Sequence, residues 1–333
     1  MSDPRPEIRR YLEQTIPGAA VSPLAGDAST RRFYRIALPD RTTRVLMDYG
    51  APFHGETDDV KLARLFGSAG LRVAAVLDSS PRNGCLVLED LGDRTLESLL
   101  VDAAGRPAAN ARTLLERAVR LAARVAEDGT PVLERSERSA GPALDEERFR
   151  FEMDFFLEHY AGSFRGVLNP PPDLRKELHE LARLAADSPS RVLCHRDFHS
   201  RNLMVLDSGR LAMVDIQDAR WGPDSYDLAS LLRDAYVEVD ESSIEQLIGH
   251  YLEDLAEPPD RESFRERFTR VAAQRMIKAL GTFGFQTVEK RSRRYLDAAG
   301  RTIARLRREL FRSRDTRTVG ELLSEAGLLD DPM

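Results

Sequence analysis

One irregular stretch, residues 191–218, interrupts a chain whose last two thirds otherwise carry the apolar periodicity of amphipathic helices. The stretch reads as a strand, a loop, a hairpin and a second loop. Loops that a rigid scaffold holds in place carry a large share of binding and catalytic residues. We therefore expect the chemistry of this chain to lie within this stretch.

A Ser-Gly turn dipeptide at 208–209 predicts a β-hairpin between two apolar runs, 203–206 and 211–214. With a two-residue loop, Asn202 and Asp215 face each other at the open end of the ladder, where paired residues lie roughly 4.5–5.5 Å apart. Two oxygen-bearing side chains at that separation suit Mg²⁺, which takes few protein oxygens together with phosphate and water. Asn202 and Asp215 are therefore the predicted metal ligands.

Asp197 precedes Asn202 by five residues, within the segment 194–202, which we call the catalytic loop. The spacing His-Arg-Asp-x-x-x-x-Asn is typical of kinases, in which the Asp accepts the proton of the attacking hydroxyl. Each of these residues alone is equally well explained as a cap or a buried hydrogen-bonding group. Together with Asp215, the spacing favours a phosphotransferase site, with Asp197 as catalytic base and His195 as structural support of the loop.

Strand and helix patterns divide the chain into two predicted domains. Domain 1–90 combines β-rich runs with one amphipathic helix, and domain 91–333 is mostly helical, with a hinge at about 88–94. This arrangement predicts an α+β fold. The strands are expected at 32–38, 43–47, 73–77 and 85–88, the helices at 57–69, 111–127, 145–160, 174–186, 224–237, 242–255, 261–280 and 295–312, and loops at 129–144, 169–173 and 256–260.

Composition narrows the function classes. The 42% hydrophobic and 31% charged residues suit a folded protein, and a net charge of -6 disfavours a general nucleic-acid-binding role. Cys85 and Cys194 lie in apolar runs, as buried thiols do in a reducing compartment. No apolar run approaches the roughly 18 residues that span a bilayer. We expect a cytoplasmic protein without nucleic-acid or membrane partners, and no feature specifies an oligomeric state.

The catalytic loop resembles that of the aminoglycoside phosphotransferase superfamily. These enzymes are related to the protein kinases, but they phosphorylate antibiotics, choline and sugars. His195, Asp197, Asn202 and Asp215 match the motif of that family residue by residue. Asp227 resembles the Asp of the Asp-Leu-Ala helix start of the family, which implies a brace for the catalytic loop. The resemblance implies a two-lobed protein-kinase-like fold, with a small β-rich N-terminal lobe and a larger helical C-terminal lobe. It also implies ATP and Mg²⁺ as cofactors.

In this family a strand-turn-strand lid covers the nucleotide phosphates, and 24–35 resembles it. Small residues there let backbone N–H groups approach phosphate oxygens, although a single glycine also suits an ordinary polar turn. The segment 86–92 resembles the inter-lobe hinge, whose backbone would contact the adenine. The expected nucleotide-binding residues are Gly26, Asp27, Ala28, Ser29, Arg31, Arg32, Arg35, Glu89 and Leu91.

The next strand departs from the family pattern, because Met47 stands where a lysine should pair with the α- and β-phosphates. Either the protein has lost catalysis and only binds ligand, or another cation anchors the phosphates. We favour the second explanation, because the predicted base and both metal ligands are retained. The candidate cations are Arg31, Arg32, Arg35 and Lys61.

The lid pattern, the missing lysine and the segments 152–156, 215–219 and 274–281 together resemble the bacterial cell-wall recycling kinases. Those enzymes phosphorylate N-acetylmuramate and N-acetylglucosamine at the anomeric hydroxyl, which implies a sugar substrate here. A kinase for another small alcohol, such as an aminoglycoside or an amino alcohol, and a nucleotide-binding pseudokinase remain the alternatives.

Sugar recognition needs polar groups that converge on the catalytic loop. Arg275 and Lys278 lie on one helical side and either meet a substrate carboxylate or face water. Several of the other candidates have an equally simple structural explanation, as loop-closing residues or surface charges. The predicted substrate residues are Glu152, Asp154, His199, Arg201, Gln217 and Asp218.

Overall fold

The computed structural model describes residues 3–24, 31–102 and 107–331. The chain divides into two compact units, one formed by Met1–Arg94 with Met204–Gln217 and the other by Thr95–Leu203 with Asp218–Met333. We call them the N-terminal unit and the C-terminal unit. The lid residues Gly26, Asp27, Ala28 and Ser29 lie outside the described residues.

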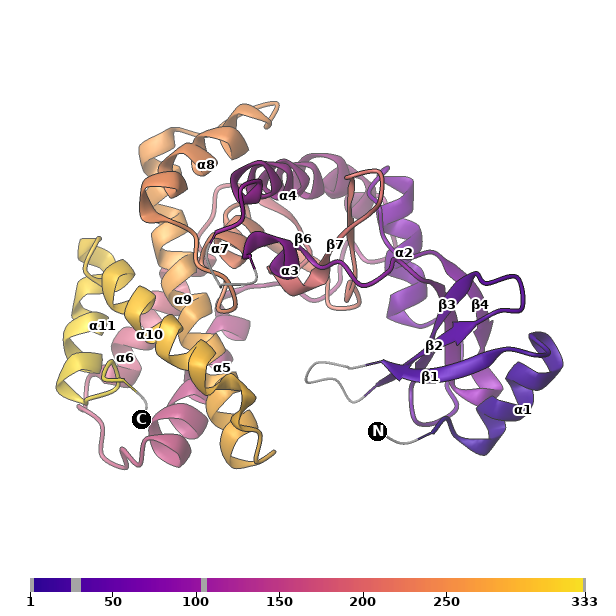
Figure 1. Cartoon of the computed structure of the whole chain (residues 1–333). Helices are drawn as coiled ribbons and strands as arrows, with labels where there is room; N and C mark the ends of the chain where they lie inside the picture. The colour runs from indigo at the N-terminus through magenta and orange to yellow at the C-terminus, as the bar shows by residue number, and fades with distance from the viewer. Residues whose placement is uncertain (1–2, 25–30, 103–106, 332–333) are drawn as a thin grey trace. The chain divides into compact units, whose positions relative to one another are not determined.

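The N-terminal unit is built on a five-stranded antiparallel sheet, in the order β1-β2-β3-β5-β4 (Figure 1). Three of the predicted strands are confirmed, but the run predicted at 73–77 begins and ends three residues later. Strand β1 was not predicted. The strands are β1 (Ala20–Leu24), β2 (Arg32–Ala37), β3 (Thr43–Asp48), β4 (Val76–Ser80) and β5 (Cys85–Glu89).

Alternation along the strands separates two faces of this sheet. Tyr34 and Leu46 are buried in a core with Ile8 and Leu12 of helix α1 (Pro6–Thr15), which the sequence analysis missed. Met47 pairs with Phe33 across β2 and β3, so both belong to the opposite face. The predicted helix at 57–69 is α2 (Asp58–Ser68).

The predicted hairpin is present as β7 (Leu203–Val205) and β8 (Leu211–Met213), but its turn differs from the prediction. The Leu206 carbonyl accepts from the Gly209 amide at 2.8 Å, and the Leu206 amide donates to the Arg210 carbonyl at 2.9 Å. The loop therefore has three residues and ends at Gly209, whose φ of 75° suits glycine. The predicted two-residue loop is wrong, and the direct pairing of Asn202 with Asp215 that it implied no longer follows.

Backbone hydrogen bonds tie this hairpin to the N-terminal unit. The Met213 amide donates to the Arg72 carbonyl at 2.9 Å, and the Val205 amide donates to the Arg94 carbonyl at 2.8 Å. These bonds explain why 204–217 belongs to the N-terminal unit although it is far along the chain. The single boundary expected at residue 90 did not anticipate this segment.

The C-terminal unit is mostly helical, as predicted, with a two-stranded sheet of β6 (Arg191–Cys194) and β9 (Arg220–Pro223). The loop predicted from residue 129 is wrong at its start, because α4 continues through Pro131 to Glu134 and buries Leu133. A π-helical segment, Leu157–Phe164, follows α5. The helices are α3 (Leu96–Leu100), α4 (Ala111–Glu134), α5 (Glu146–Phe156), α6 (Leu174–Ala186), α7 (Tyr226–Leu232), α8 (Glu241–Glu253), α9 (Arg261–Val288), α10 (Leu296–Leu310) and α11 (Arg314–Glu325). No helix among the described residues is long and apolar enough to cross a membrane.

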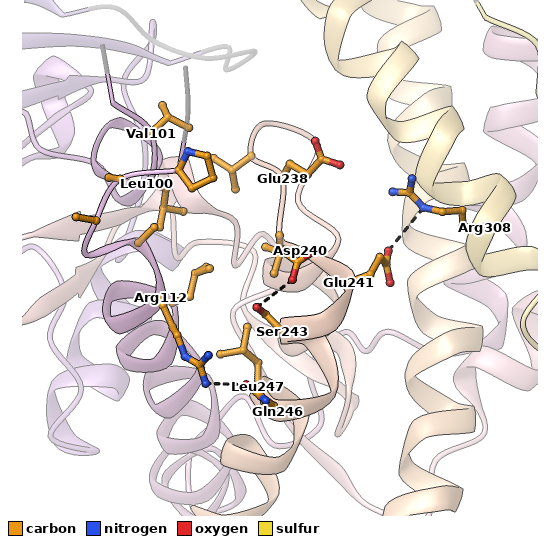
Figure 2. Close-up of a pocket in the computed structure, with 17 residues that line it drawn as sticks. Leu100, Val101, Arg112, Glu238, Asp240, Glu241, Ser243, Gln246, Leu247 and Arg308 are labelled. Atoms are coloured by element: carbon orange, nitrogen blue, oxygen red, sulfur yellow. Dashed lines mark hydrogen bonds and ion pairs between the residues drawn. The ribbon is translucent and has the colours of Figure 1, made fainter. Parts of the chain in front are cut away.

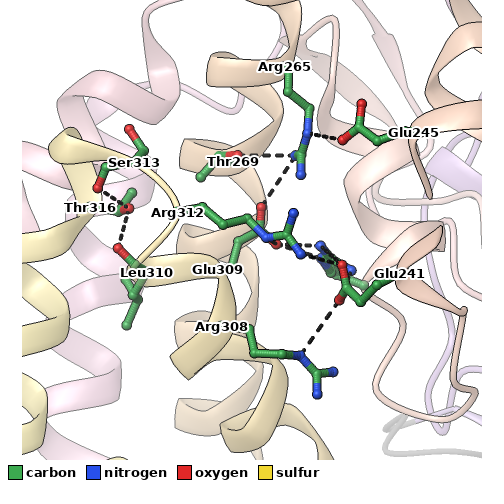
Figure 3. Close-up of polar contacts among 11 residues, drawn as sticks. Glu241, Glu245, Arg265, Thr269, Arg308, Glu309, Leu310, Arg312, Ser313 and Thr316 are labelled. Atoms are coloured by element: carbon green, nitrogen blue, oxygen red, sulfur yellow. Dashed lines mark hydrogen bonds and ion pairs between the residues drawn. The ribbon is translucent and has the colours of Figure 1, made fainter. Parts of the chain in front are cut away.

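A buried carboxylate links several of these helices (Figure 3). Glu309 of α10 is fully buried and accepts from the Arg233 Nε at 2.9 Å, with Arg265 of α9 at 3.4 Å. Arg233 also donates to Glu241 at the start of α8, at 3.0 Å. Buried charges of this kind need such compensation, because the loss of one partner leaves the other uncompensated in the interior.

Helix α9 is the longest in this unit, and it crosses the π-helical segment at close range. A Cβ atom at Gly284 would lie 2.6 Å from the His159 carbonyl oxygen and 2.8 Å from the Tyr160 Cα. Both neighbours are backbone atoms, which cannot rotate away. Only glycine fits this crossing without a shift of the two elements.

We expect Gly284→Ala to lower the free energy of unfolding by about 1–3 kcal/mol, because the added methyl overpacks the crossing. The matched control is Gly67→Ala in α2, where a Cβ meets nothing within 4 Å. This control should be neutral or stabilise by roughly 0.5–1 kcal/mol. Urea denaturation of both variants measures the difference, and equal stabilities would contradict the close crossing.

Candidate active site

One carboxylate, that of Asp227 in α7, holds the start of the catalytic loop. Its two oxygens accept from consecutive backbone amides, those of His195 at 2.6 Å and Arg196 at 3.0 Å. The brace predicted for Asp227 is therefore present in the structure. His195 is fully buried and packs edge-on against Phe198, which agrees with its expected structural role.

Arg196 gives the loop its shape. Its φ of 81° lies in the left-handed region, where a side chain other than glycine is strained and needs support. Arg275 of α9 supplies that support by donating to the Arg196 carbonyl at 2.8 Å and to the Ser230 hydroxyl at 2.6 Å, and its guanidinium lies over the Tyr226 ring. Arg275 thus stabilises the backbone conformation of the catalytic loop.

Asp197, the predicted base, follows directly, with a side chain that is 26% exposed. The Lys278 ammonium of α9 lies 3.4 Å from its Oδ1. Burial alone would raise the pKa of Asp197, but the charges of Lys278 and Arg196 outweigh it and hold the pKa well below its usual range. The carboxylate is therefore ionised at neutral pH, ready to accept a hydrogen bond from a hydroxyl. The sequence analysis had left open whether Lys278 faces water.

The two predicted metal ligands lie in different units, and each offers a hard oxygen donor. The Asn202 Nδ2 donates to the Asp197 carbonyl at 2.9 Å, which leaves the amide oxygen of Asn202 as the donor atom for a cation. Asp215 has a φ of 62° and a carboxylate that is 43% exposed. An amide and a carboxylate oxygen suit Mg²⁺ bound to phosphates. Among the described residues, no group of three or more His, Cys, Asp or Glu side chains is placed to hold a metal.

The candidate cations of the nucleotide side have different surroundings. Arg35 donates to both Asp90 and Asp93, at 2.6 and 2.8 Å, and these bonds raise its pKa further. Arg31 instead lies beside Met47, with its Nη1 3.7 Å from the Met47 Sδ. Arg32 begins β2 and is exposed, as is Lys61 on α2.

At the expected hinge, the Glu89 amide donates to the Ala75 carbonyl at 2.8 Å, and its carboxylate pairs with Arg72. Any adenine contact of Glu89 would therefore use its carbonyl. Leu91 follows β5 and is partly buried.

Two of the predicted substrate residues share one partner, Arg196. Glu152 is 3% exposed, accepts from Gln274 at 2.9 Å and lies 3.7 Å from Arg196, while Asp218 lies 3.0 Å from Arg196. Asp154 belongs to a separate cluster, where it pairs with Arg175 and His179 of α6. Gln274 was not singled out from the sequence as a site residue.

Of the other predicted substrate residues, His199 and Arg201 lie in the catalytic loop, and Gln217 follows β8. Arg201 donates two bonds to Glu97, at 2.8 and 3.0 Å, and lies 3.5 Å over the Tyr236 ring, so it closes the loop. His199 packs edge-on against the same ring. The Gln217 Oε1 is buried without a hydrogen-bond partner among the described residues, which leaves an acceptor for a ligand.

A cavity of about 530 Å³ lies elsewhere in the C-terminal unit, between the end of α3, the start of α4 and the start of α8 (Figure 2). Arg112 and Gln246 bond across it at 2.6 Å. None of the predicted catalytic, metal or substrate residues lines this cavity. The predicted catalytic, metal and substrate residues therefore do not coincide with this cavity.

We expect Asp227→Ala to lower the free energy of unfolding by about 2–6 kcal/mol, because two buried amides lose their acceptor.

Burial raises the pKa of Asp227 to about 7, and its two backbone donors act in the opposite direction. Wild type should therefore lose stability, relative to the non-titrating Asp227→Asn variant, as the pH rises from about 4 through about 7. Urea denaturation across this range measures both effects, and a pH-independent difference would contradict the raised pKa.

Solved structures with a similar fold are kinases and antibiotic phosphotransferases. An ethanolamine kinase of Plasmodium vivax superposes with a TM-score of 0.61 at 12% identity, covering 89% of this chain and 85% of that one. Spectinomycin phosphotransferase APH(9)-Ia, solved with ADP and spectinomycin, also has a TM-score of 0.61 at 12% identity and covers 96% and 98%. The predicted α+β, protein-kinase-like fold is confirmed.

Sequence comparison finds relatives with a higher identity to this chain than the solved structures have. An N-acetylmuramate/N-acetylglucosamine kinase of Pseudomonas aeruginosa is 31% identical over 93% of this chain and 89% of its own length. A kinase of the same name from Neisseria meningitidis is 31% identical over 78% and 76%. The model of the phosphotransferase enzyme family matches residues 20–266. The chain therefore belongs to the phosphotransferase enzyme family and is an enzyme that transfers a phosphoryl group to an alcohol group of a small molecule.

Proposed function

We propose that the protein is a cytoplasmic, ATP- and Mg²⁺-dependent kinase that phosphorylates the anomeric hydroxyl of N-acetylmuramate, N-acetylglucosamine or both. The observation that carries this proposal is the placement of Asp197 beside Lys278 in a braced kinase-type loop, in a chain 31% identical to two kinases named for those sugars. The two relatives supply the substrate class, and the loop supplies the chemistry.

In the proposed reaction the sugar hydroxyl oxygen attacks the γ-phosphorus, the bond from that phosphorus to the leaving diphosphate breaks, and the hydroxyl proton passes to Asp197. A carboxylate whose pKa is held low is a weak base. It therefore orients the hydroxyl first and takes the proton as the new bond makes that hydroxyl acidic. An anomeric hydroxyl suits such a base, because the ring oxygen makes it more acidic than the other ring hydroxyls.

Asn202 and Asp215 are the residues that would hold Mg²⁺, which offsets the charge of the nucleotide phosphates when bound. The donor set fits, because the Asn202 amide nitrogen is already used within the loop and its oxygen is not. For the nucleotide, the lid and the backbone of Glu89 and Leu91 are the proposed contacts. For the sugar, the unpaired Gln217 oxygen and Asp218 are the foremost of the candidates.

The proposal is tested with the full chain, Mg-ATP and three acceptors, N-acetylmuramate, N-acetylglucosamine and kanamycin. We expect a sugar 1-phosphate, identified by ³¹P NMR, with one or both amino sugars. Release of ADP that depends on kanamycin would favour a kinase for a different alcohol. Nucleotide binding without transfer to any acceptor would favour a pseudokinase, the alternative that Met47 suggests.

We expect Asp197→Asn to lower kcat by roughly 10²–10⁴-fold while ADP still binds, because only the proton acceptor is lost. Asp215→Asn should weaken nucleotide binding in Mg²⁺ as well, because it removes a proposed metal ligand. Asp207→Asn, at the exposed hairpin tip, is the matched control and should resemble wild type. Steady-state kinetics and calorimetry separate the variants, and wild-type kcat in Asp197→Asn would contradict the base assignment.

A further inference from the structure

A cation lies beside Met47, the residue that stands in the place of the missing strand lysine. Met47 lies on the sheet face opposite the α1 core, and the Arg31 guanidinium lies against its sulfur at 3.7 Å. Arg31 precedes β2, so it reaches this position from the neighbouring strand rather than from β3. The positive charge is therefore displaced in sequence but lies beside the side chain that stands in the lysine position.

A carboxylate from α2 fixes this guanidinium. Asp59 lies in the first turn of α2, and its Oδ1 accepts from the Arg31 Nη1 at 2.8 Å. The two side chains are only 14% and 11% exposed, so the ion pair is shielded from water. In kinases the strand lysine is held by a glutamate of a helix in the same way. Arg31 and Asp59 reproduce that ion pair with both residue types exchanged.

A tyrosine fixes the carboxylate in turn. The Tyr49 hydroxyl donates to the Asp59 Oδ2 at 2.5 Å, and both burial and this bond raise the pKa of Tyr49. Tyr49 follows directly after β3, so the sheet itself positions the whole assembly. The three residues form a chain of charge-assisted hydrogen bonds, and we call them the arginine clamp.

The guanidinium also reaches toward a proposed metal ligand, because the Arg31 Nη2 lies 3.4 Å from the Asp215 Oδ1. Both groups belong to the N-terminal unit. A guanidinium has five N–H donors in a planar fork, so it can keep its bond to Asp59 while donating to phosphate oxygens. Arg35 has no such placement, since it is bound by Asp90 and Asp93.

We propose that Arg31 anchors the phosphates of a nucleoside di- or triphosphate in place of the strand lysine, and that Asp59 and Tyr49 are its positioning residues. This inference rests on the proposed kinase function and specifies how its nucleotide is held. It selects one cation among the four candidates and adds two residues that sequence patterns do not mark. It also assigns Met47 a role as the apolar surface on which the guanidinium lies.

The test moves the positive charge from position 31 to position 47. In Arg31→Met, the dissociation constant for ADP should rise about tenfold or more, because a charge-assisted contact to phosphate is lost. In the double variant Arg31→Met with Met47→Lys, the affinity should recover by at least half of that loss on a logarithmic scale. Calorimetry in EDTA and again in Mg²⁺ shows whether the effect is independent of the metal ligands.

Arg44→Met is the matched control. Arg44 lies in β3, three residues from Met47 and on the other sheet face, so this variant should bind ADP with the affinity of wild type. Asp59→Asn should weaken ADP binding in the wild-type background but have no further effect in Arg31→Met, since its role runs through the arginine. Asp59→Glu should restore part of the affinity. Circular dichroism confirms that each variant is folded.

The outcomes distinguish a failure of the proposed kinase function from a failure of the proposed role of Arg31. Wild-type protein that binds no nucleotide would overturn the proposed function itself. Wild-type ADP affinity in folded Arg31→Met would overturn only the role of Arg31. A double variant as weak as Arg31→Met would overturn the equivalence of the two positions, and additive effects of Asp59→Asn and Arg31→Met would overturn the positioning role of Asp59.

Discussion

The bonds from Asp227 to two consecutive backbone amides determine where the reactive groups of the C-terminal unit lie. They fix His195 and Arg196, and Arg196 has a left-handed backbone conformation directly before Asp197. Asn202 then bonds the Asp197 carbonyl, so the second half of the loop takes its position from the first. A single buried side chain thus sets the conformation of the segment that carries the predicted base.

Helix α9 stabilises the same segment from a second side through three residues within five positions. Gln274 bonds Glu152, which approaches the Arg196 guanidinium; Arg275 bonds the Arg196 carbonyl; and Lys278 lies beside Asp197. Residues four apart lie on one face of a helix, so this spacing follows from helix geometry. The charge that keeps Asp197 ionised therefore comes from a rigid element, which favours a constant electrostatic environment during turnover.

The sequence alone was sufficient to predict the family and the presence of the hairpin, because both are encoded in local patterns. The spacing of Asp197, Asn202 and Asp215 predicted the family, which the comparisons confirm, and the hairpin was recognised from its turn. Its register was not, because a Ser-Gly pair fits both a two-residue loop and the three-residue loop that Gly209 closes. A difference of one residue in that loop changes which positions face each other.

Interactions between distant segments could not be predicted. Met47 revealed that a cation was missing, but nothing in the sequence separates Asp59 from an ordinary residue in the first turn of a helix. Arg275 and Lys278 looked equivalent on their helix, yet one supports the loop backbone and the other contacts the carboxylate. The partner of Asp59 is 28 residues away and the loop partners of Arg275 and Lys278 are 79 and 81 residues away, and only the folded chain brings them together.

The buried carboxylate of Glu309 has a consequence for how far this protein can be shortened. The family match ends at residue 266, so α10 and α11 lie outside the matched region. Arg233 lies inside the matched region, with a side chain only 2% exposed, and Glu309 from outside that region neutralises it. A truncation before α10 would remove one of the two carboxylates that pair with Arg233, at the end of the helix that braces the catalytic loop, and would leave only Glu241. The helix α10 therefore supplies part of the charge balance of the matched region, and a shortened chain would have to replace the carboxylate of Glu309 or remove the charge of Arg233.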